Sequence, residues 1–182
     1  MIIYLTKETV KRYGITLNQD LEDFEKAQNQ NLFHWGGKIF YLGGKKCIQL
    51  LNFASKLSIC LFFINKKDLD DLEDLVFGYL KEIYKDDFQM TWILDDYYKD
   101  MGTRVYGPLK NRRVIASLNK NQLDLIESEI LDDYIEGNLL QTIDFNKFIN
   151  TCLVTDMVNG KREYIQPEER FSELLKEYYR NK

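Results

Sequence analysis

The sequence predicts an α+β fold in which an antiparallel β-meander packs against several α-helices and the C-terminal part is helical. The pair Gly43-Gly44 separates two apolar runs, KIFYL and KCIQLLN, and a glycine pair in this position is typical of a tight hairpin turn. A third apolar run over residues 57–64 adds a strand to this meander. Residues 68–85 then change to helical periodicity, which predicts that helices cover the sheet.

The N-terminal segment predicts one short strand and two short helices. Apolar residues Ile2 to Leu5 indicate the strand. Thr6 is a good N-cap for a helix that runs to Tyr13, and Gly14 is a typical helix end. Residues 18–30 are polar and predict a weak helix followed by a loop.

The middle of the chain predicts two helices. The apolar side chains of residues 68–85 fall on one helical face, with acidic residues in the first turn and lysines in the last, as the helix dipole favours. These apolar residues are Leu69, Leu72, Val76, Leu80 and Ile83. Residues 89–100 predict a second helix, with Trp92 buried and Asp95, Asp96 and Asp100 outward; a strand is the alternative for the segment FQMTWI.

After residue 100 the sequence predicts two strands and then a helix. The segments 104–106 and 113–118 are read as strands separated by the turn GPLKN. Asn119 with Gln122 three positions later resembles a capping box, which predicts a helix from there to about Tyr134.

The C-terminal region predicts two more helices joined through a turn. Asp144 is expected to cap a short helix, Asn159-Gly160 to form a turn, and Pro167 to stand in the first turn of the last helix. We therefore expect an α+β domain over residues 1–139 and a helical extension over residues 140–182, packed together as a single globular unit.

Composition predicts a soluble protein of the bacterial cytoplasm. The formal net charge is −4, the start lacks the apolar core of a signal peptide, and no apolar run is long enough to span a bilayer. Cys47, Cys60 and Cys152 are widely spaced and odd in number, so we expect free thiols rather than disulfides.

The sequence carries no recognisable catalytic, cofactor or metal motif, so we expect a protein that is not an enzyme and binds no cofactor. His34 is the single histidine, and no serine or cysteine that could act with it lies in a recognisable nucleophile motif. Neighbouring acids such as Asp95-Asp96 point about 100° apart on a helix and do not converge on one ion. The dipeptide His34-Trp35 is read either as a binding residue beside an aromatic platform or as structural residues that anchor the sheet.

Charges are segregated along the chain. Residues 27–67 and 101–123 contain bases and no acid, whereas residues 68–74 carry five acids and residues 124–136 carry six, with no base in either. Such segregation can create a bipolar surface, and it can equally reflect ordinary solubility. The candidate acidic partner-binding residues are Asp70, Asp71, Asp74, Glu129, Asp132 and Asp133. The candidate nucleic-acid contacts are Lys45, Lys46, Arg112, Arg113 and Trp35, with Tyr41 as an alternative stacking residue.

The segments MIIYLTK, WGGKIFYLGGKKCIQLLNFAS and VYGPLKNRRVIASLN resemble a bacterial family known only as a domain of unknown function. The resemblance covers about residues 1–135 and implies no activity. The matching positions are Thr6, Lys7, Trp35, Lys46, Asn52, Arg112 or Arg113, Ser117 and Asn119. The chain departs from the family at Gly43-Gly44, where a basic residue is more usual, and this weakens any interpretation of the turn as a phosphate site.

By type rather than by motif, the chain is also similar to small proteins of phages and mobile elements, among them the anti-CRISPR proteins. This similarity suggests an inhibitor whose acidic face binds a guide-loaded type II CRISPR nuclease and blocks DNA binding or cleavage, since such nucleases depend on phosphate contacts. The first alternative is a nucleic-acid-binding module that uses the basic strands and turns. The second is an enzyme with an unrecognised site, in which Asn52, Arg112 and Asn119 would converge at strand ends.

Overall fold

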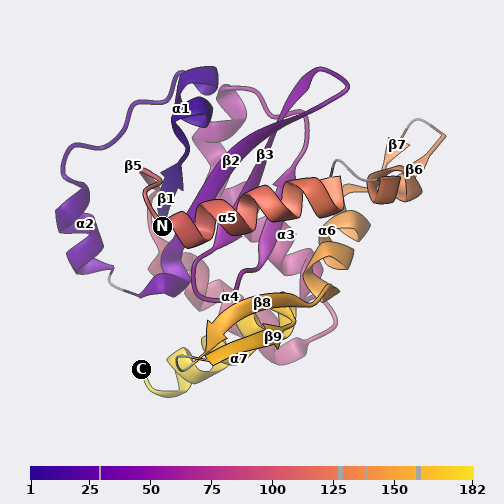
Figure 1. The fold of residues 1–182 in the computed structure, drawn as a ribbon. Coiled ribbons are helices and arrows are strands. Elements are labelled where there is room, and N and C mark those ends of the chain that lie inside the picture. The colour runs from indigo at the N-terminus through magenta and orange to yellow at the C-terminus, as the bar shows by residue number, and fades with distance from the viewer. Residues whose placement is uncertain (29, 127–128, 138, 159–160) are drawn as a thin grey trace.

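A computed structural model describes residues 1–28, 30–126, 129–137, 139–158 and 161–182, and its centre is a five-stranded sheet in the order β4-β3-β2-β1-β5 (Figure 1). The strands are β1 (Ile2–Leu5), β2 (His34–Leu42), β3 (Lys45–Asn52), β4 (Ser58–Leu61) and β5 (Val105–Pro108). The predicted meander is present as β2-β3-β4. A purely antiparallel sheet is wrong, however, because β1 runs parallel to both β2 and β5.

The hairpin between β2 and β3 forms where the glycine pair predicts it. Leu42 pairs with Lys45, so Gly43 and Gly44 alone make the turn, with φ of 55° and 76°. Both values lie in the left-handed region that glycine enters without steric cost, which confirms the predicted turn and fixes the register of the longest strand pair.

The parallel pairing of β1 with β2 requires a crossover connection, and the N-terminal helices supply it. This connection contains α1 (Lys7–Tyr13), α2 (Leu21–Ala27) and η1 (Asn31–Phe33). Thr6 accepts a hydrogen bond from the Thr9 N–H, and Gly14 ends α1 at φ 62°, so both predicted helix boundaries are confirmed.

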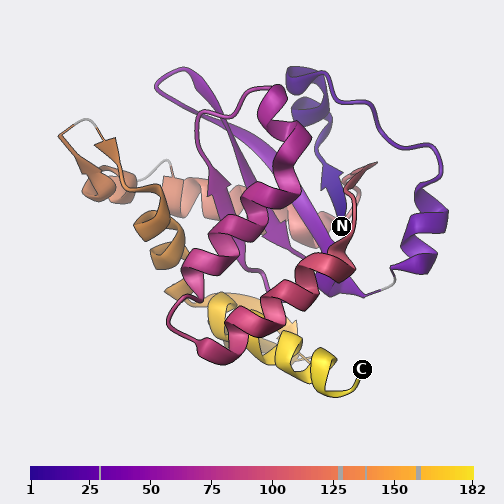
Figure 2. The same cartoon turned by 180° about the vertical axis from the view of Figure 1, so that it is seen from behind.

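Helices cover both faces of the sheet. Figure 2 shows α3 (Leu72–Ile83), α4 (Phe88–Met101) and α7 (Pro167–Arg180) over one face, whereas α5 (Arg112–Asn121) crosses the other face in Figure 1. The short helix η2 (Lys67–Asp71) precedes α3. The main core lies under the three-helix layer, where Trp35, Ile39 and Leu50 of the sheet meet the apolar stripes of these helices. No described helix is long and apolar enough to cross a membrane.

Two predictions for the middle of the chain are wrong. The segment 113–118 is not a strand but part of α5, which Asn111 caps by accepting from the Arg113 and Val114 N–H groups. Val114 and Leu118 are four residues apart and bury the same helical face, and so short an apolar run fits either periodicity. Trp92 is 65% exposed, because the inward stripe of α4 is formed by other side chains. These are Met90, Leu94, Tyr97 and Met101.

The region after α5 is less regular than predicted. The expected helix from Asn119 to Tyr134 is replaced by the end of α5, one turn of π-helix η3 (Gln122–Ile126) and the 3-10 helix η4 (Glu129–Tyr134). A small hairpin of β6 (Ile135–Glu136) and β7 (Leu139–Leu140) leads into α6 (Thr142–Thr151).

The C-terminal part is not purely helical. An antiparallel hairpin of β8 (Val154–Val158) and β9 (Lys161–Ile165) separates α6 from α7, and its described residues pair with no strand of the main sheet. The predicted turn at Asn159-Gly160 lies outside the described residues. Pro167 begins α7 as predicted. Phe171 of α7 belongs to the main core, whereas the predicted division of the chain at residue 139 stays a prediction.

Asparagine side chains close both edges of the sheet. On β4, the Cys60 N–H donates to Asn146 Oδ1 at 2.7 Å and Asn146 Nδ2 donates to the Cys60 carbonyl at 2.9 Å. Asn150, one turn later on α6, makes the same pair of bonds to Ser58, each 2.7 Å long. On β5, the Tyr106 N–H donates to Asn18 Oδ1 at 2.7 Å, and the Asn18 N–H donates to the Tyr106 carbonyl at 2.9 Å. Backbone groups that would attract another chain are thereby satisfied.

Replacing the two α6 carboxamides should destabilise the fold. We expect the double variant Asn146→Ala/Asn150→Ala to lose about 2–5 kcal/mol of unfolding free energy, because four buried backbone groups of β4 lose their partners. Urea denaturation checks this. Asn119→Ala is the control: it brings half the gain in helix propensity at an exposed position of α5, where the side chain loses only a surface hydrogen bond from Lys38. Equal stability of the two variants would show that the edge bonds contribute nothing.

Candidate functional site

The acidic residues predicted to bind a partner lie at opposite edges of the sheet. Asp70 and Asp71 of η2 and Asp74 of α3 lie near the β5 edge, where Arg104 forms ion pairs of 2.7 Å with Glu73 and 3.8 Å with Asp70. Asp74 accepts a hydrogen bond from the Tyr98 hydroxyl.

The second acidic group lies on η4, which carries Glu129, Asp132 and Asp133 as exposed residues. Leu131 of η4 packs with Phe145 in the cluster beside β4, the strand at the other edge of the sheet. The structure therefore does not bring the two acidic groups onto one face.

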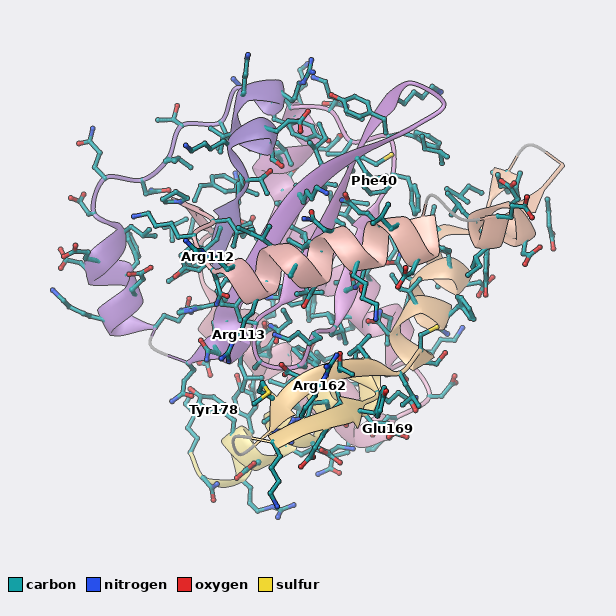
Figure 3. The ribbon with its side chains drawn as sticks, viewed as in Figure 1. Phe40, Arg112, Arg113, Arg162, Glu169 and Tyr178 are labelled. Carbon is teal, nitrogen blue, oxygen red and sulfur yellow. The ribbon has the colours of Figure 1, made fainter. Side chains whose placement is uncertain are left out.

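The predicted basic residues are divided as well. Lys45 and Lys46 follow the hairpin turn, where their ammonium groups lie 5.0 Å and 5.3 Å from the ring centroids of Phe63 and Tyr13. Arg112 and Arg113 begin α5, well away from that turn (Figures 1 and 3).

The proposed role of Trp35 as a nucleic-acid contact is wrong, because its side chain is fully buried. Its Nε1 donates to the Tyr97 hydroxyl at 3.2 Å, and this hydroxyl donates to the Leu32 carbonyl at 2.8 Å. No base could stack on the Trp35 ring unless the main core opened.

The constellation suggested for an enzyme does not form. Asn52 is buried, and its side chain holds the turn after β3 by donating to the Leu32 carbonyl and accepting from the Ser55 N–H. Arg112 and Asn119 are seven positions apart on α5, a helical rise of about 10 Å.

His34 lies 2.6 Å from the Gln28 carbonyl through its Nε2. Burial lowers the pKa of His34, a shift that this bond partly opposes. The structural interpretation of the dipeptide His34-Trp35 is therefore the one that the contacts support.

The cysteines have the environment of structural thiols. Cys47 and Cys60 are buried and Cys152 is half-buried, and all three are free. Burial raises the pKa of each of these thiols, so the protonated form is favoured at neutral pH. Within the part of the chain that the structure describes, no three potential ligands among His, Cys, Asp and Glu gather as a metal site would require.

A cleft between α5 and β8 is the candidate site. It consists of two adjoining cavities of about 400 and 240 Å³, both lined by α5 on one side and β8 on the other. Lys56 lines both cavities from the floor, and it forms a 3.6 Å ion pair with Asp156 of β8. We call this feature the α5–β8 cleft.

Cations outnumber carboxylates in the α5–β8 cleft. Among the described residues that line it, the charged ones are the basic residues Lys56, Arg113, Lys120 and Arg170 and the acidic residues Asp124 and Asp156. Arg113 and Lys120 are exposed, so their charges are available to a ligand. A narrow cleft with an excess of one charge attracts ligands of the opposite sign, although the whole chain is acidic.

The outer face of the β8–β9 hairpin continues this surface. Met157 lines the cleft and pairs across the hairpin with Arg162, while Thr155 pairs with Tyr164. Because alternate residues of a strand share a face, these four side chains lie on one side of the hairpin. Tyr164 is 77% exposed, and Figure 3 shows Arg162 on the hairpin below α5. An exposed tyrosine beside an arginine is a suitable platform for a flat ring.

The position of α5 depends on a glycine in β2. A Cβ atom added to Gly36 would lie 2.4 Å from Val114 Cγ1 and 3.3 Å from Phe53 Cε1. Only glycine therefore allows α5 to pack this closely on the sheet. One turn later on α5, Leu118 packs in the same cluster as Leu51 of β3. This packing sets one wall of the α5–β8 cleft.

Comparison with known proteins identifies the family. Residues 2–170 match the family described as a domain of unknown function, DUF6933. The chain belongs to this family. The match confirms the resemblance seen in the sequence and extends through β8, β9 and the start of α7, so both walls of the α5–β8 cleft lie within the DUF6933 domain. No curated protein and no solved structure gave a match.

Part of this DUF6933 site was visible in the sequence and part was not. Arg113 and Lys120 lie in the acid-free segment 101–123, and Lys56 lies in the acid-free segment 27–67. Arg170 stands among glutamates in the segment PEERFSE, where no local signal marks it. Only the tertiary structure brings it beside the other three bases.

Substituting Gly36 should displace α5. We expect Gly36→Ala to cost about 1–3 kcal/mol of unfolding free energy through overpacking against Val114. In the double variant Gly36→Ala/Val114→Ala the two costs should be less than additive, because the clashing methyl group is gone. Gly78→Ala is the matched control: it has no neighbour within 4 Å and should stabilise α3 by about 0.5–1 kcal/mol. Chemical denaturation of the wild type, the single variants Gly36→Ala and Val114→Ala, their double variant and the Gly78→Ala control tests this, and strict additivity would contradict it.

Proposed function

We propose that this DUF6933 protein is a non-enzymatic binding protein that holds single-stranded nucleic acid in the α5–β8 cleft. The observation that carries the proposal is that four basic residues from distant segments of the chain line one cleft, beside an exposed tyrosine and arginine. Phosphate groups would lie along Arg113 and Lys120, and an unpaired base would stack on Tyr164.

The geometry favours a single strand over a duplex. Stacking on Tyr164 requires a base whose face is free, and the bases of a duplex are stacked on one another. The Lys56–Asp156 ion pair lies on the cleft floor, with side chains that are 10% and 21% exposed. Lys56 is therefore already paired within the protein, and we assign the phosphate contacts to the exposed basic residues Arg113 and Lys120.

Removing the two exposed basic side chains of the cleft should weaken the binding of nucleic acid and reduce the salt dependence of that binding. We expect Arg113→Ala/Lys120→Ala to lower the affinity for a labelled single strand of about 12 nucleotides at least tenfold at low salt. The slope of log K against log salt should fall by about 1.4, or about 0.7 for each phosphate that the variant no longer neutralises. Fluorescence anisotropy with DNA and RNA strands, titrated between about 50 and 200 mM salt, measures both quantities.

Two further variants make this test specific. Lys7→Ala/Lys11→Ala removes the same charge from exposed positions of α1 and should leave the affinity within about twofold of wild type. Lys45→Ala/Lys46→Ala tests the hairpin turn that the sequence suggested. Absence of binding at low salt would refute the proposed function, and a loss confined to the hairpin variant would place the contact outside the cleft.

One observation favours a second candidate function, inhibition of an RNA-guided nuclease. The η4 residues Glu129, Asp132 and Asp133 form an exposed run of carboxylates, and spaced carboxylates can imitate a row of phosphates. The η2 acids fit this role less well, because Arg104 pairs with Asp70 and with the neighbouring Glu73.

If the second candidate is correct, excess protein should slow DNA cleavage by a guide-loaded type II nuclease. We expect Asp132→Lys/Asp133→Lys to abolish the inhibition, because it reverses the sign of the patch. Asp70→Lys/Asp71→Lys carries the same charge change at the other edge of the sheet and should inhibit like wild type. Cleavage assays at matched protein concentrations measure this, and an unchanged rate with the wild-type protein would eliminate the candidate.

A further inference from the structure

A third cavity, of about 610 Å³, lies beside the α5–β8 cleft. It is lined by residues of α2, of the end of β5 and of the loop that leads into α5. Phe53 and Asn111 line both this cavity and the larger cavity of the cleft. The two spaces therefore meet at these residues, and a ligand that lies in the cleft can extend into the third cavity.

The wall of the third cavity contains stacked aromatic rings. The ring centroids of Tyr4 and Phe53 lie 5.1 Å apart at an interplanar angle of 24°, and His34 makes a T-shaped contact with each of these rings. Phe53 is half-buried, and it stands between the third cavity and the basic cleft. A flat heteroaromatic ring can stack there while its charged substituent remains on the other side of Phe53.

One carboxylate in the third cavity is held in a fixed position. Glu25 Oε1 accepts a hydrogen bond of 2.7 Å from the Tyr4 hydroxyl, and the side chain is half-buried. The other cavity carboxylates, those of Asp20, Glu22 and Asp23, belong to exposed residues. Glu25 is therefore the acceptor with a defined direction, and none of the described residues forms a hydrogen bond with its second oxygen.

The charges of the two spaces are opposite. The third cavity has four carboxylates and one base, Lys110, whereas the cleft beyond Phe53 is lined by Arg113, Arg170 and Lys56 together with Asp156. A phosphate is attracted to the α5–β8 cleft and repelled from the third cavity. The third cavity suits a group that donates hydrogen bonds, and carboxylates accept well from the exocyclic amino group of a nucleobase.

We infer that the third cavity receives a nucleobase that carries an exocyclic amino group, from a strand whose phosphates lie in the α5–β8 cleft. Glu25 accepts from the amino group, and the base stacks on Phe53. Thymine and uracil present carbonyl oxygens in place of that amino group and would face a carboxylate with like polarity. This inference rests on the proposed function and adds a base preference to it.

Strands of one base type test the preference. We expect an oligo-dC strand of about 12 nucleotides to bind about tenfold more tightly than an oligo-dT strand of equal length, as one carboxylate–amino contact allows. In Glu25→Gln one side-chain oxygen still accepts from Tyr4, but the other becomes an NH₂ donor that meets the amino donor of cytosine. The preference for oligo-dC should then disappear, with oligo-dT binding held or improved.

Glu22→Gln is the matched control, because it removes the same charge from an exposed position of the same cavity and should keep the preference. Circular dichroism melting verifies that both variants are folded. Equal binding of oligo-dC and oligo-dT by the wild type would overturn the inference and leave the proposed function intact. If Glu25→Gln raised the affinity for oligo-dC and oligo-dT equally, the inference would also be overturned, because the carboxylate would then act through its charge alone. No binding of either strand at low salt would refute the proposed function itself.

Discussion

Two carboxamides of α6 occupy the place that another strand would take beside β4. Asn146 and Asn150 each present one acceptor and one donor to a backbone N–H and C=O of that strand, with the spacing of one helical turn. This contact ends the sheet and at the same time fixes α6 against it. Because β8 begins just after α6, the contact also places the β8–β9 hairpin opposite α5. The α5–β8 cleft is thus a consequence of how the sheet is closed.

The elements that could be predicted from the sequence have local causes. Gly43-Gly44 makes its turn, Thr6 and Gly14 bound α1, and Pro167 begins α7. The position of β1 beside both β2 and β5 could not be predicted, because strand partners are chosen by burial among segments far apart in the chain. Residues 113–118 illustrate the remaining error: the apolar spacing of Val114 and Leu118 fits a helix, and the capping signal at Asn111 decides the matter.

The candidate site was predictable only in fragments. Segregated charge drew attention to Arg113, which lines the cleft, yet a charge pattern carries no information on which segments meet. Lys45 and Lys46 have the same signal and lie elsewhere. Arg170 has no signal and lines the cleft. Trp35 shows that residue type alone does not separate a stacking platform from a core anchor, since the decision depends on burial beneath α4 and α7.

The β8–β9 hairpin forms a separate two-stranded sheet, and within the described residues its strands add nothing to the ladder of the main sheet. Changes in the length of these two strands would leave the hydrogen bonds of the central strands untouched. Natural variation can therefore accumulate in this appendage at low cost to folding. If the α5–β8 cleft binds a ligand as proposed, a change of this hairpin would alter the ligand preference while the main sheet stayed the same, as exchangeable loops do on other rigid frameworks.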